Sequence, residues 1–381
     1  MRLEAPVPAK VREGVQAPLI ESPVHLLDAP ILQPLGLLLD LAGETLRERL
    51  FVVQTPDGGP EQCLRPDFTI PALRAHIASG RREGRYFYSG HAFRVAPAGS
   101  NRAEEFPQFG IEAFETGDAS QADAEMAALA WRSACAGGRE DLTLVLGDVG
   151  LFGIVVDALD LAPPLASRLK RAFSSPRRLR AELDAAVNGG AGATSRGGDG
   201  LARLLAQLPE HEAVMVLEEI WTLAGIEPVG GRSPAEIVHR LVDRTALARA
   251  DRLTPAQADL FRAFLGIAGE PDAALEAVLQ LVGSASGQLS AAREGWVRRV
   301  EVMVRAGVPR DRLRFSAAFG RAFGYYDGMV FEVRSAALGD EQPIAAGGRY
   351  DGLPARLGAS LPTGAVGCMV RPGRAWADAQ P

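Results

Sequence analysis

Hydrophobic and polar side chains alternate along residues 86–115, on both sides of a Gly-, Ser- and Asn-containing stretch at 97–102. Successive side chains of a β-strand point to opposite faces, so a period of two predicts strands. We therefore expect two antiparallel strands joined by a long hairpin loop. Further strands are predicted at 142–148, 315–333, 344–353 and 365–370.

Helical periodicity dominates a long Ala-, Leu- and Arg-rich region from 157 to 310. Within it, SPAE at 233–236 and TPAQ at 254–257 each combine a capping residue, proline at the first helical position and Glu or Gln three residues after the cap. This combination predicts the start of a helix. Ser120 and Asp123 form a capping-box pattern ahead of another helix, AEMAALAWRSACA.

The order of these patterns predicts an α+β chain in which a sheet is interrupted by an insertion. We assign residues 1–156 and 311–381 to the core and 157–310 to a mainly helical insertion, in which the glycine-rich stretch at 188–200 predicts a mobile loop. A chain of 381 residues has room for both parts, since domains usually have about 100–200 residues.

Charge and composition narrow the classes of function. The net charge of -6 and the pI near 5.6 argue against the concentrated basic surface of a nucleic-acid-binding domain. The three cysteines and five histidines show no spacing typical of metal ligands, so we expect no metal, no disulfide framework and no cofactor. No apolar stretch reaches the roughly 18 residues of a membrane span, so we expect a cytoplasmic protein without membrane contact.

Two polar pairs are candidates for a binding site. Asp67 and Thr69 in LRPDFT would share one side of a strand, where a carboxylate and a hydroxyl could hold an ammonium group. Without other evidence an ordinary turn is favoured, with Asp67 capping the helix that follows. Gln108 and Glu112 share one face of the second hairpin strand, but a half-buried sheet with a solvated outer face would show the same spacing.

Arginine, tyrosine and glycine residues supply further candidates. Arg94 ends a predicted strand, where its guanidinium could bind a carboxylate or a phosphate through two hydrogen bonds, although an arginine there is more often only solvated. Tyr325 and Tyr326 could line a small pocket or form a plain turn. GGRYDG at 347–352 could bring backbone close to a ligand, or could be a bend.

Taken in order, these segments resemble histidyl-tRNA synthetase, a class II aminoacyl-tRNA synthetase with an antiparallel sheet flanked by helices. LRPDFT is similar to LRPEGT in that family, and FRVAPAGSNRAEEFPQFGIEAF is similar to its motif 2 hairpin, FRxERPxxGRYRxFxQxGxExF. GRAFGYYDGMVFE resembles RGLDYYxxTVFE, and AAGGRYDGL is nearly identical to the second histidine-specific segment. The resemblance covers most of residues 15–150 and 310–370.

The resemblance implies a pocket of the size of histidine with an anion contact beside it. The positions that match the pocket of the family are Asp67, Thr69, Gln108, Glu112, Tyr325 and Tyr326. Arg94 stands where the family places the arginine that contacts the α-phosphate, and Arg321 stands at the arginine that supports adenylate formation.

Three departures from the family weaken the nucleotide half of this site. Ala96 replaces the glutamate that holds adenine and offers no hydrogen bond. Glu104 replaces a basic residue near the expected triphosphate, a reversal that could cost several kcal/mol at an effective dielectric constant of about 20. Motif 3 reads RPGR at 371–374 in place of a helical GLER, and Pro and Gly are poor helix formers, so Arg374 is not expected to reach a nucleotide.

These departures change the implied function. The chain stops at Pro381, where the synthetase continues into an anticodon-binding domain, so we expect no selection of tRNA. A synthetase-like core with a histidine pocket and an impaired nucleotide site resembles the regulatory subunits of short-form ATP phosphoribosyltransferases, a family of histidyl-tRNA synthetase paralogues.

The second resemblance implies a non-catalytic cytoplasmic protein without catalytic residues of its own. It would assemble with a short catalytic subunit into a hetero-oligomer, associate with itself as a dimer and bind L-histidine. The chain would be required for the activity of its partner and would take part in feedback inhibition by histidine. The partner joins ATP and phosphoribosyl diphosphate, the first step of histidine biosynthesis.

Two other interpretations stay open at this point. The chain could be an enzyme that adenylates an amino acid and passes it to an acceptor other than tRNA, which Arg94 and Arg321 favour and Ala96 and Glu104 oppose. Alternatively, the pocket could be vestigial and the fold could serve only as an assembly scaffold.

Overall fold

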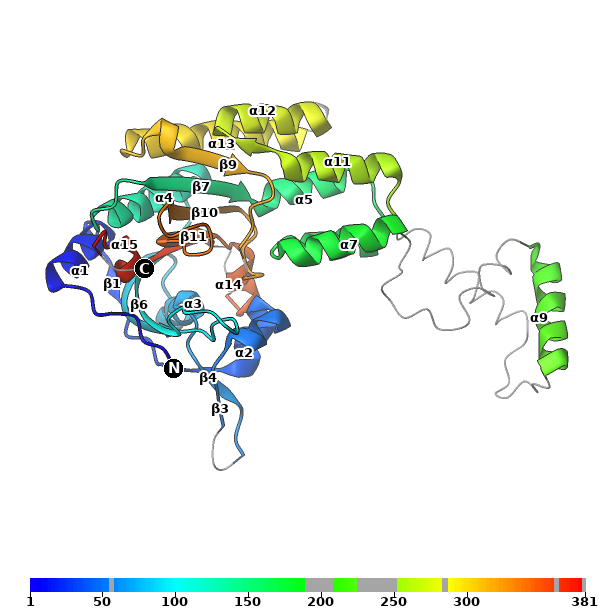
Figure 1. Cartoon of the computed structure of the whole chain (residues 1–381), viewed down its shortest axis with the longest axis horizontal. Helices are drawn as coiled ribbons and strands as arrows, with labels where there is room; N and C mark the ends of the chain where they lie inside the picture. Colours follow the sequence, from blue (N-terminus) through cyan, green and yellow to red (C-terminus); the bar gives the residue numbers. More distant parts are fainter. Residues whose placement is uncertain are drawn as a thin grey trace. The chain divides into compact units, whose positions relative to one another are not determined.

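The computed structural model describes residues 1–54, 58–188, 208–224, 252–282, 287–321, 323–359 and 363–378. The chain divides into two compact units, one made of residues 1–154 with 263–381 and the other of residues 155–262 (Figure 1). Nearly all of the glycine-rich stretch at 188–200 and the whole helix start expected at 233–236 lie outside the described residues.

The first unit is built on one large sheet, which has nine strands within the described ranges, in the order β1-β5-β6-β12-β11-β10-β7-β9-β8. Most neighbours are antiparallel, as predicted, and the sheet is mixed because β1 and β5 run parallel, as do β7 and β9. The α+β class is confirmed. A second, small sheet has the order β2-β4-β3. The described strands of both sheets are β1 His25–Leu26, β2 Leu32–Pro34, β3 Val52–Val53, β4 Gln62–Leu64, β5 Gly84–Phe93, β6 Glu105–Glu115, β7 Leu142–Asp148, β8 Ala268–Gly269, β9 Leu313–Ser316, β10 Met329–Ser335, β11 Ala345–Arg349 and β12 Gly364–Val370.

β5 and β6 form the long antiparallel hairpin that the alternating pattern predicts, with Tyr86 opposite Glu112 and Phe93 opposite Glu105. β7 has the predicted bounds. Both faces of β6 are covered, since Phe109 and Ile111 are each 1% exposed on the face opposite Gln108 and Glu112. The interpretation of a half-buried sheet with a solvated outer face is therefore wrong for this strand.

Helices flank this sheet on both faces. α4 packs against β10, β11 and β12, and α13 packs on α4. On the other face, α2 and α3 share a hydrophobic core with Phe114 and Tyr350. The helices are α1 Ala9–Gln16, α2 Leu35–Ala42, α3 Thr69–Ser79, α4 Ala119–Cys135, α5 Val149–Ala158, α6 Pro163–Ala172, α7 Pro176–Asn188, α9 Glu210–Ala224, α11 Pro255–Gly266, α12 Pro271–Val282, α13 Gly287–Arg305, α14 Gly352–Arg356 and α15 Pro372–Ala375, with short 3-10 turns at Ala17–Ile20, Glu44–Arg49 and Arg310–Arg312. None of these helices, within the part of the chain that is described, has the length and apolar character needed to cross a membrane.

The second unit is shorter than the insertion expected at 157–310, because it ends at Arg262. α12 packs on β9 and α13 on α4, so both helices group with the sheet. Trp296 on α13 is fully buried, and its ring centroid lies 5.2 Å from that of Phe315 on β9. Helical periodicity shows that one face of a helix is buried, but it does not show which unit of the chain covers that face. The sequence therefore predicted the end of the insertion at 310 instead of 262.

Two of the predicted helix starts lie within the described residues, and they differ in how they are capped. At α11, Gln257 N donates to Thr254 Oγ1 at 3.2 Å and Thr254 N donates to Gln257 Oε1 at 2.9 Å, which confirms the capping box in TPAQ. At α4 the capping residue is Asp118, whose side chain accepts from Ser120 N. The expected Ser120–Asp123 box is wrong, because Asp123 is buried in an ion-pair network.

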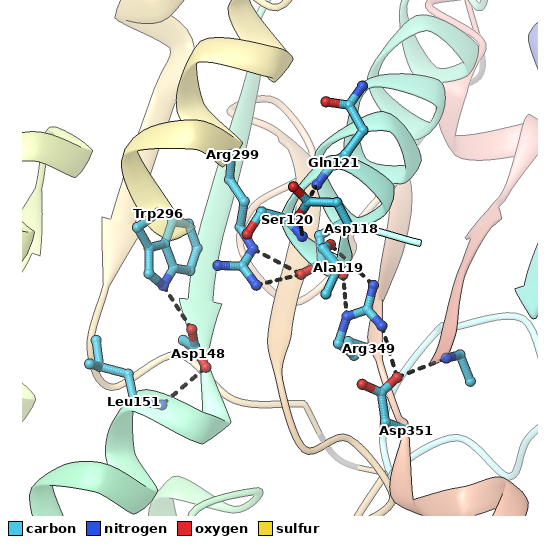
Figure 2. A network of polar contacts seen from close by, with 12 residues as sticks. Asp118, Ala119, Ser120, Gln121, Asp148, Leu151, Trp296, Arg299, Arg349 and Asp351 are labelled. Atoms are coloured by element: carbon cyan, nitrogen blue, oxygen red, sulfur yellow. Dashed lines mark hydrogen bonds and ion pairs between the residues drawn. The ribbon is translucent and has the colours of Figure 1, made fainter. Parts of the chain in front are cut away.

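That network joins α13, α4 and the end of β11 (Figure 2). Asp123 is 0% exposed, and it accepts from Arg349 Nε at 2.6 Å through one oxygen and from Arg299 Nε at 2.8 Å through the other. Arg349 also donates to Asp351 Oδ1 at 2.8 Å and to Ala119 O at 3.1 Å. The carboxylate of Asp123 therefore fixes the strand end that carries the next residue, Tyr350.

Asp123→Ala is expected to lower the free energy of unfolding by about 3–5 kcal/mol, since it removes the buried carboxylate that Arg349 and Arg299 share and leaves Arg349 only the exposed Asp351 as an acidic partner. Asp118→Asn is the matched control on the same helix. It removes the exposed ion pair with Arg298 but keeps a capping side chain, so it should cost less than about 1 kcal/mol. Urea unfolding measures both, and similar losses for the two variants would contradict the role assigned to Asp123.

Candidate functional site

A cavity lined by polar and aromatic side chains lies beside the start of α3 and is the candidate site. All six residues expected in the pocket and both candidate anion contacts line it. The lining residues are Asp67, Thr69, Tyr88, Arg94, Gln108, Glu112, Arg321, Phe323, Tyr325, Tyr326, Ala346, Gly367, Cys368 and Met369.

Asp67 and Thr69 reach this cavity from a turn and a helix start, not from a strand. Thr69 is the first residue of α3, Phe68 is its capping residue, and no side chain caps this helix. The interpretation of Asp67 as a helix cap is therefore wrong. Asp67 is only 5% exposed, and burial raises the pKa of its carboxyl group despite the nearby charge of Arg94.

Glu112 is the most constrained group in the cavity. Its Oε1 accepts from Thr69 Oγ1 at 2.9 Å, and its Oε2 accepts from the hydroxyl of Tyr350 at 2.5 Å. A Cβ atom at Gly367 would lie 1.7 Å from Glu112 Oε2, so only glycine leaves room for the carboxyl group. Burial raises the pKa of Glu112 to about 8, against the lowering effect of these hydrogen bonds.

Gln108 and Glu112 do share one face of β6, as the spacing predicts, and both face the cavity. Between them, Gly110 makes space for the Tyr88 side chain from the opposite strand, because a Cβ there would lie 2.2 Å from the Tyr88 hydroxyl. Gln108 Nε2 donates to that hydroxyl at 3.4 Å.

Arg94 and Arg321 bring two guanidinium groups to the same cavity. Arg94 Nε donates to Pro66 O at 2.9 Å, and burial followed by repulsion from Arg49 lowers the pKa of Arg94 to about 10. The group therefore stays charged at neutral pH. Arg321 Nη1 donates to Glu332 Oε1 at 2.8 Å.

Aromatic side chains form one wall, as expected for Tyr325 and Tyr326. Their ring centroids are 4.7 Å apart, and the Tyr325 hydroxyl donates to Asp67 Oδ2 at 3.5 Å. Sequence reasoning missed Tyr88, which lines the cavity, and Tyr350, which lies behind Glu112. The hairpin register, which sets position 88 opposite position 110, was a usable signal for Tyr88.

Three buried polar atoms of the lining have no hydrogen-bond partner among the described residues: Asp67 Oδ1, Gln108 Oε1 and Arg321 Nε. An unpaired buried polar group costs about 1–3 kcal/mol, so three around one small cavity indicate a ligand that pairs with them. Two are acceptors, a carboxyl oxygen and an amide oxygen, and one is a guanidinium donor. This set complements an ammonium group and a carboxylate, the two charged ends of a free amino acid.

Glu112→Gln is expected to flatten the pH dependence of stability. The pKa of Glu112 is near 8 in the folded chain and about 4.3 when unfolded, so the unfolded chain loses this proton first as the pH rises. Stability is therefore lost between about pH 4.3 and 8, by up to about 1.4 kcal/mol per pH unit.

Urea unfolding of both proteins at about pH 5.5 and 7.5 tests this expectation, because the wild type should lose more stability than the variant between the two pH values. Equal losses would show that Glu112 does not titrate in this range.

The family model described as Histidyl-tRNA synthetase matches residues 25–227 and 234–371 of the chain. The ATP phosphoribosyltransferase regulatory subunit of Mesorhizobium japonicum is 37% identical over 352 residues, which cover 91% of both chains. The protein of the same name from Brucella anthropi is 35% identical over 365 residues, which cover 94% of both chains.

Solved structures support the fold. An ATP phosphoribosyltransferase regulatory subunit/histidyl-tRNA synthetase from Bacillus halodurans has a TM-score of 0.62 at 20% identity, over 97% of this chain and 78% of that one. A histidyl-tRNA synthetase from Nostoc sp. PCC 7120 has a TM-score of 0.59 at 16% identity, over 96% and 69% of the two chains. The chain belongs to the histidyl-tRNA synthetase-like family of ATP phosphoribosyltransferase regulatory subunits.

Proposed function

We propose that this chain is the regulatory subunit of a short-form ATP phosphoribosyltransferase and has no catalytic activity of its own. It is required for the activity of a short catalytic subunit, which joins ATP and phosphoribosyl diphosphate in the first step of histidine biosynthesis. It takes part in feedback inhibition by binding L-histidine and acts in the cytoplasm. The relatives with 35–37% identity over more than nine-tenths of the chain carry the regulatory-subunit name.

The observation that carries the ligand assignment is the set of unpaired atoms around the cavity. The α-ammonium group of an amino acid would donate to Asp67 Oδ1 and Gln108 Oε1, and its carboxylate would accept from Arg321 Nε. Each of these contacts pairs a buried polar atom that the protein leaves unpaired. All three residues line one cavity, so one small ligand would contact them together.

With the backbone groups of histidine paired in this way, its imidazole ring would contact Glu112 and the wall formed by Tyr325 and Tyr326. Glu112 is held by Thr69 and Tyr350, so its carboxyl group keeps one position. An imidazole N–H would donate to this group. A cationic ring would also lower the pKa of Glu112, because a nearby positive charge favours the ionised carboxylate. An aliphatic side chain has no group that could donate to this carboxyl group. The cavity should therefore favour histidine over leucine or valine.

Ligand binding regulates a complex only if it has different affinities for two states of that complex. Histidine that stabilises the inhibited state must change the assembly equilibrium, and the catalytic subunit must then change the histidine affinity by the same factor. Self-association as a dimer is part of the proposal. β1 is an edge strand whose Leu26 is 80% exposed, and a second copy would cover such an edge.

The alternative is an enzyme that still adenylates an amino acid. Arg94 and Arg321 favour it, since both line the cavity that would hold the α-phosphate of an aminoacyl-adenylate. The nucleotide half opposes it. Arg374 donates to Pro343 O at 2.9 Å and so already has a partner, and Ala96 offers no side-chain hydrogen bond to a base. Exchange of diphosphate into ATP that depends on an amino acid would support this enzyme.

Phosphoribosyl-ATP formation by the short catalytic subunit of the same organism tests the main proposal. The rate should rise strongly when this chain is added and fall again when histidine is added. The chain alone should form no product. No effect on a competent catalytic subunit would contradict the proposal and would direct attention to the exchange assay.

Asp67→Asn is expected to weaken histidine binding about 10- to 100-fold, because a hydrogen bond between charged groups is worth about 1.5–3 kcal/mol. The matched control is Asp141→Asn, which alters a carboxylate that accepts from Ser335 Oγ at 2.6 Å and does not line the cavity. Titration calorimetry measures both. Unchanged affinity in the Asp67 variant would remove this residue from the site.

A further inference from the structure

Arg321 differs from most residues of the cavity wall because neither a helix nor a strand carries it. It lies between β9, which ends at Ser316, and β10, which begins at Met329. Its side chain is nevertheless buried, and its Nε has no hydrogen-bond partner among the described residues. A side chain on a loop is placed less precisely than one on a strand, so an arginine that meets a ligand needs an anchor.

Glu332 on β10 supplies this anchor. Arg321 Nη1 donates to Glu332 Oε1 at 2.8 Å, and the two side chains are 8% and 13% exposed. Glu332 stands opposite Ala346 of β11, which lines the cavity. The guanidinium carbon of Arg321 also lies 5.7 Å from the ring centroid of Tyr326, another lining residue. The sheet therefore holds the guanidinium group directly beside the cavity.

An acidic anchor has an electrostatic cost for the binding of an anion. Arg321 and Glu332 together carry no net charge. A ligand carboxylate at Arg321 Nε would be attracted by the guanidinium group but repelled by Glu332, and both effects are strong where water is largely excluded. The anchor helps such a ligand only if another charge offsets that of Glu332.

Arg334 provides the offsetting charge. It follows Glu332 by two residues on β10 and so lies on the same face of the sheet. Its Nε and Nη2 donate to Glu332 Oε2 at 3.0 and 2.9 Å, and its guanidinium carbon lies 5.2 Å from the ring centroid of Phe319. Asp340 also pairs with Arg334, but it is 88% exposed and water screens its charge. Two arginines on one buried glutamate leave a net positive charge beside the cavity.

We propose that Glu332 and Arg334 are positioning residues for recognition of the carboxylate of a free amino acid. Glu332 holds Arg321 beside the cavity, and Arg334 offsets the charge of Glu332 so that a net positive charge faces the ligand. This inference rests on the proposed function, because it assumes that Arg321 Nε meets the ligand carboxylate. It assigns a role in binding to Arg334, which is not a lining residue of the cavity.

The test compares L-histidine with L-histidinol, which has the same ammonium group and ring but a hydroxymethyl group in place of the carboxylate. Titration calorimetry of the wild type should show about 10- to 100-fold tighter binding of histidine. Arg334→Gln keeps a donor toward Glu332 and removes the charge. It should weaken histidine binding about tenfold and change histidinol binding by less than about threefold. A general loss of structure would weaken both ligands alike.

Two controls separate the charge of Arg334 from other effects. Arg334→Lys keeps a cation beside Glu332 and should keep the wild-type preference for histidine within about threefold. Arg85→Gln removes an arginine of similar exposure from β5 of the same sheet, where Arg85 Nη2 lies 3.1 Å from Glu115 Oε1. It lowers the net charge of the chain by the same amount and should change neither affinity.

The proposal is overturned if Arg334→Gln keeps the wild-type preference for histidine over histidinol, or if it weakens both ligands equally. Should this variant fail to fold, Arg334→Met decides, because it also removes the charge and keeps a long side chain against Phe319. A wild type that binds both ligands equally well would overturn this inference and leave histidine binding standing. A wild type that binds no histidine would overturn the proposed function as well.

Discussion

The site depends on one buried carboxylate that does not touch it. Asp123 on α4 pairs with Arg349 and Arg299 on one face of the sheet, and side chains alternate along a strand, so Tyr350 emerges on the other face. There its hydroxyl meets Glu112. The position of the pocket carboxyl group thus follows from an ion pair on the far side of the sheet, and α13 takes part through Arg299.

This support lets the cavity keep buried polar atoms that have no hydrogen-bond partner among the described residues. Asp67 and Glu112 are both buried, burial raises the pKa of each, and repulsion from Asp67 raises the pKa of Glu112 further. A site optimised for stability alone would pair or remove them. Their retention on a rigid frame is the usual relation between a binding site, which has preorganised polar groups, and the core that stabilises it.

Local patterns predicted the strands well and the long-range pairs not at all. β7 and the β5–β6 hairpin follow from alternation in the sequence, and the cap of α11 follows from TPAQ. Asp123 looked like part of a cap because its partner Arg349 lies 226 residues away, and Glu4 attracted no notice because its partner Arg371 lies 367 residues away. The resemblance supplied the six pocket residues, whose positions no local rule contains. Tyr350 was missed since its contact with Glu112 spans the whole second unit.

The cavity is assembled from segments around 67–69, 88–112, 321–326 and 346–369, with the entire second unit between the second and third. During synthesis at about 5–20 residues per second, roughly 10–50 s pass between the emergence of Glu112 and that of Gly367. For that time the ribosome carries a chain whose hairpin exists but whose pocket does not, with Phe106 and the polar face of β6 uncovered. Newly made chains therefore complete this cavity only after β12 has emerged, and the unfinished sheet is the stage at which this protein most needs protection from aggregation.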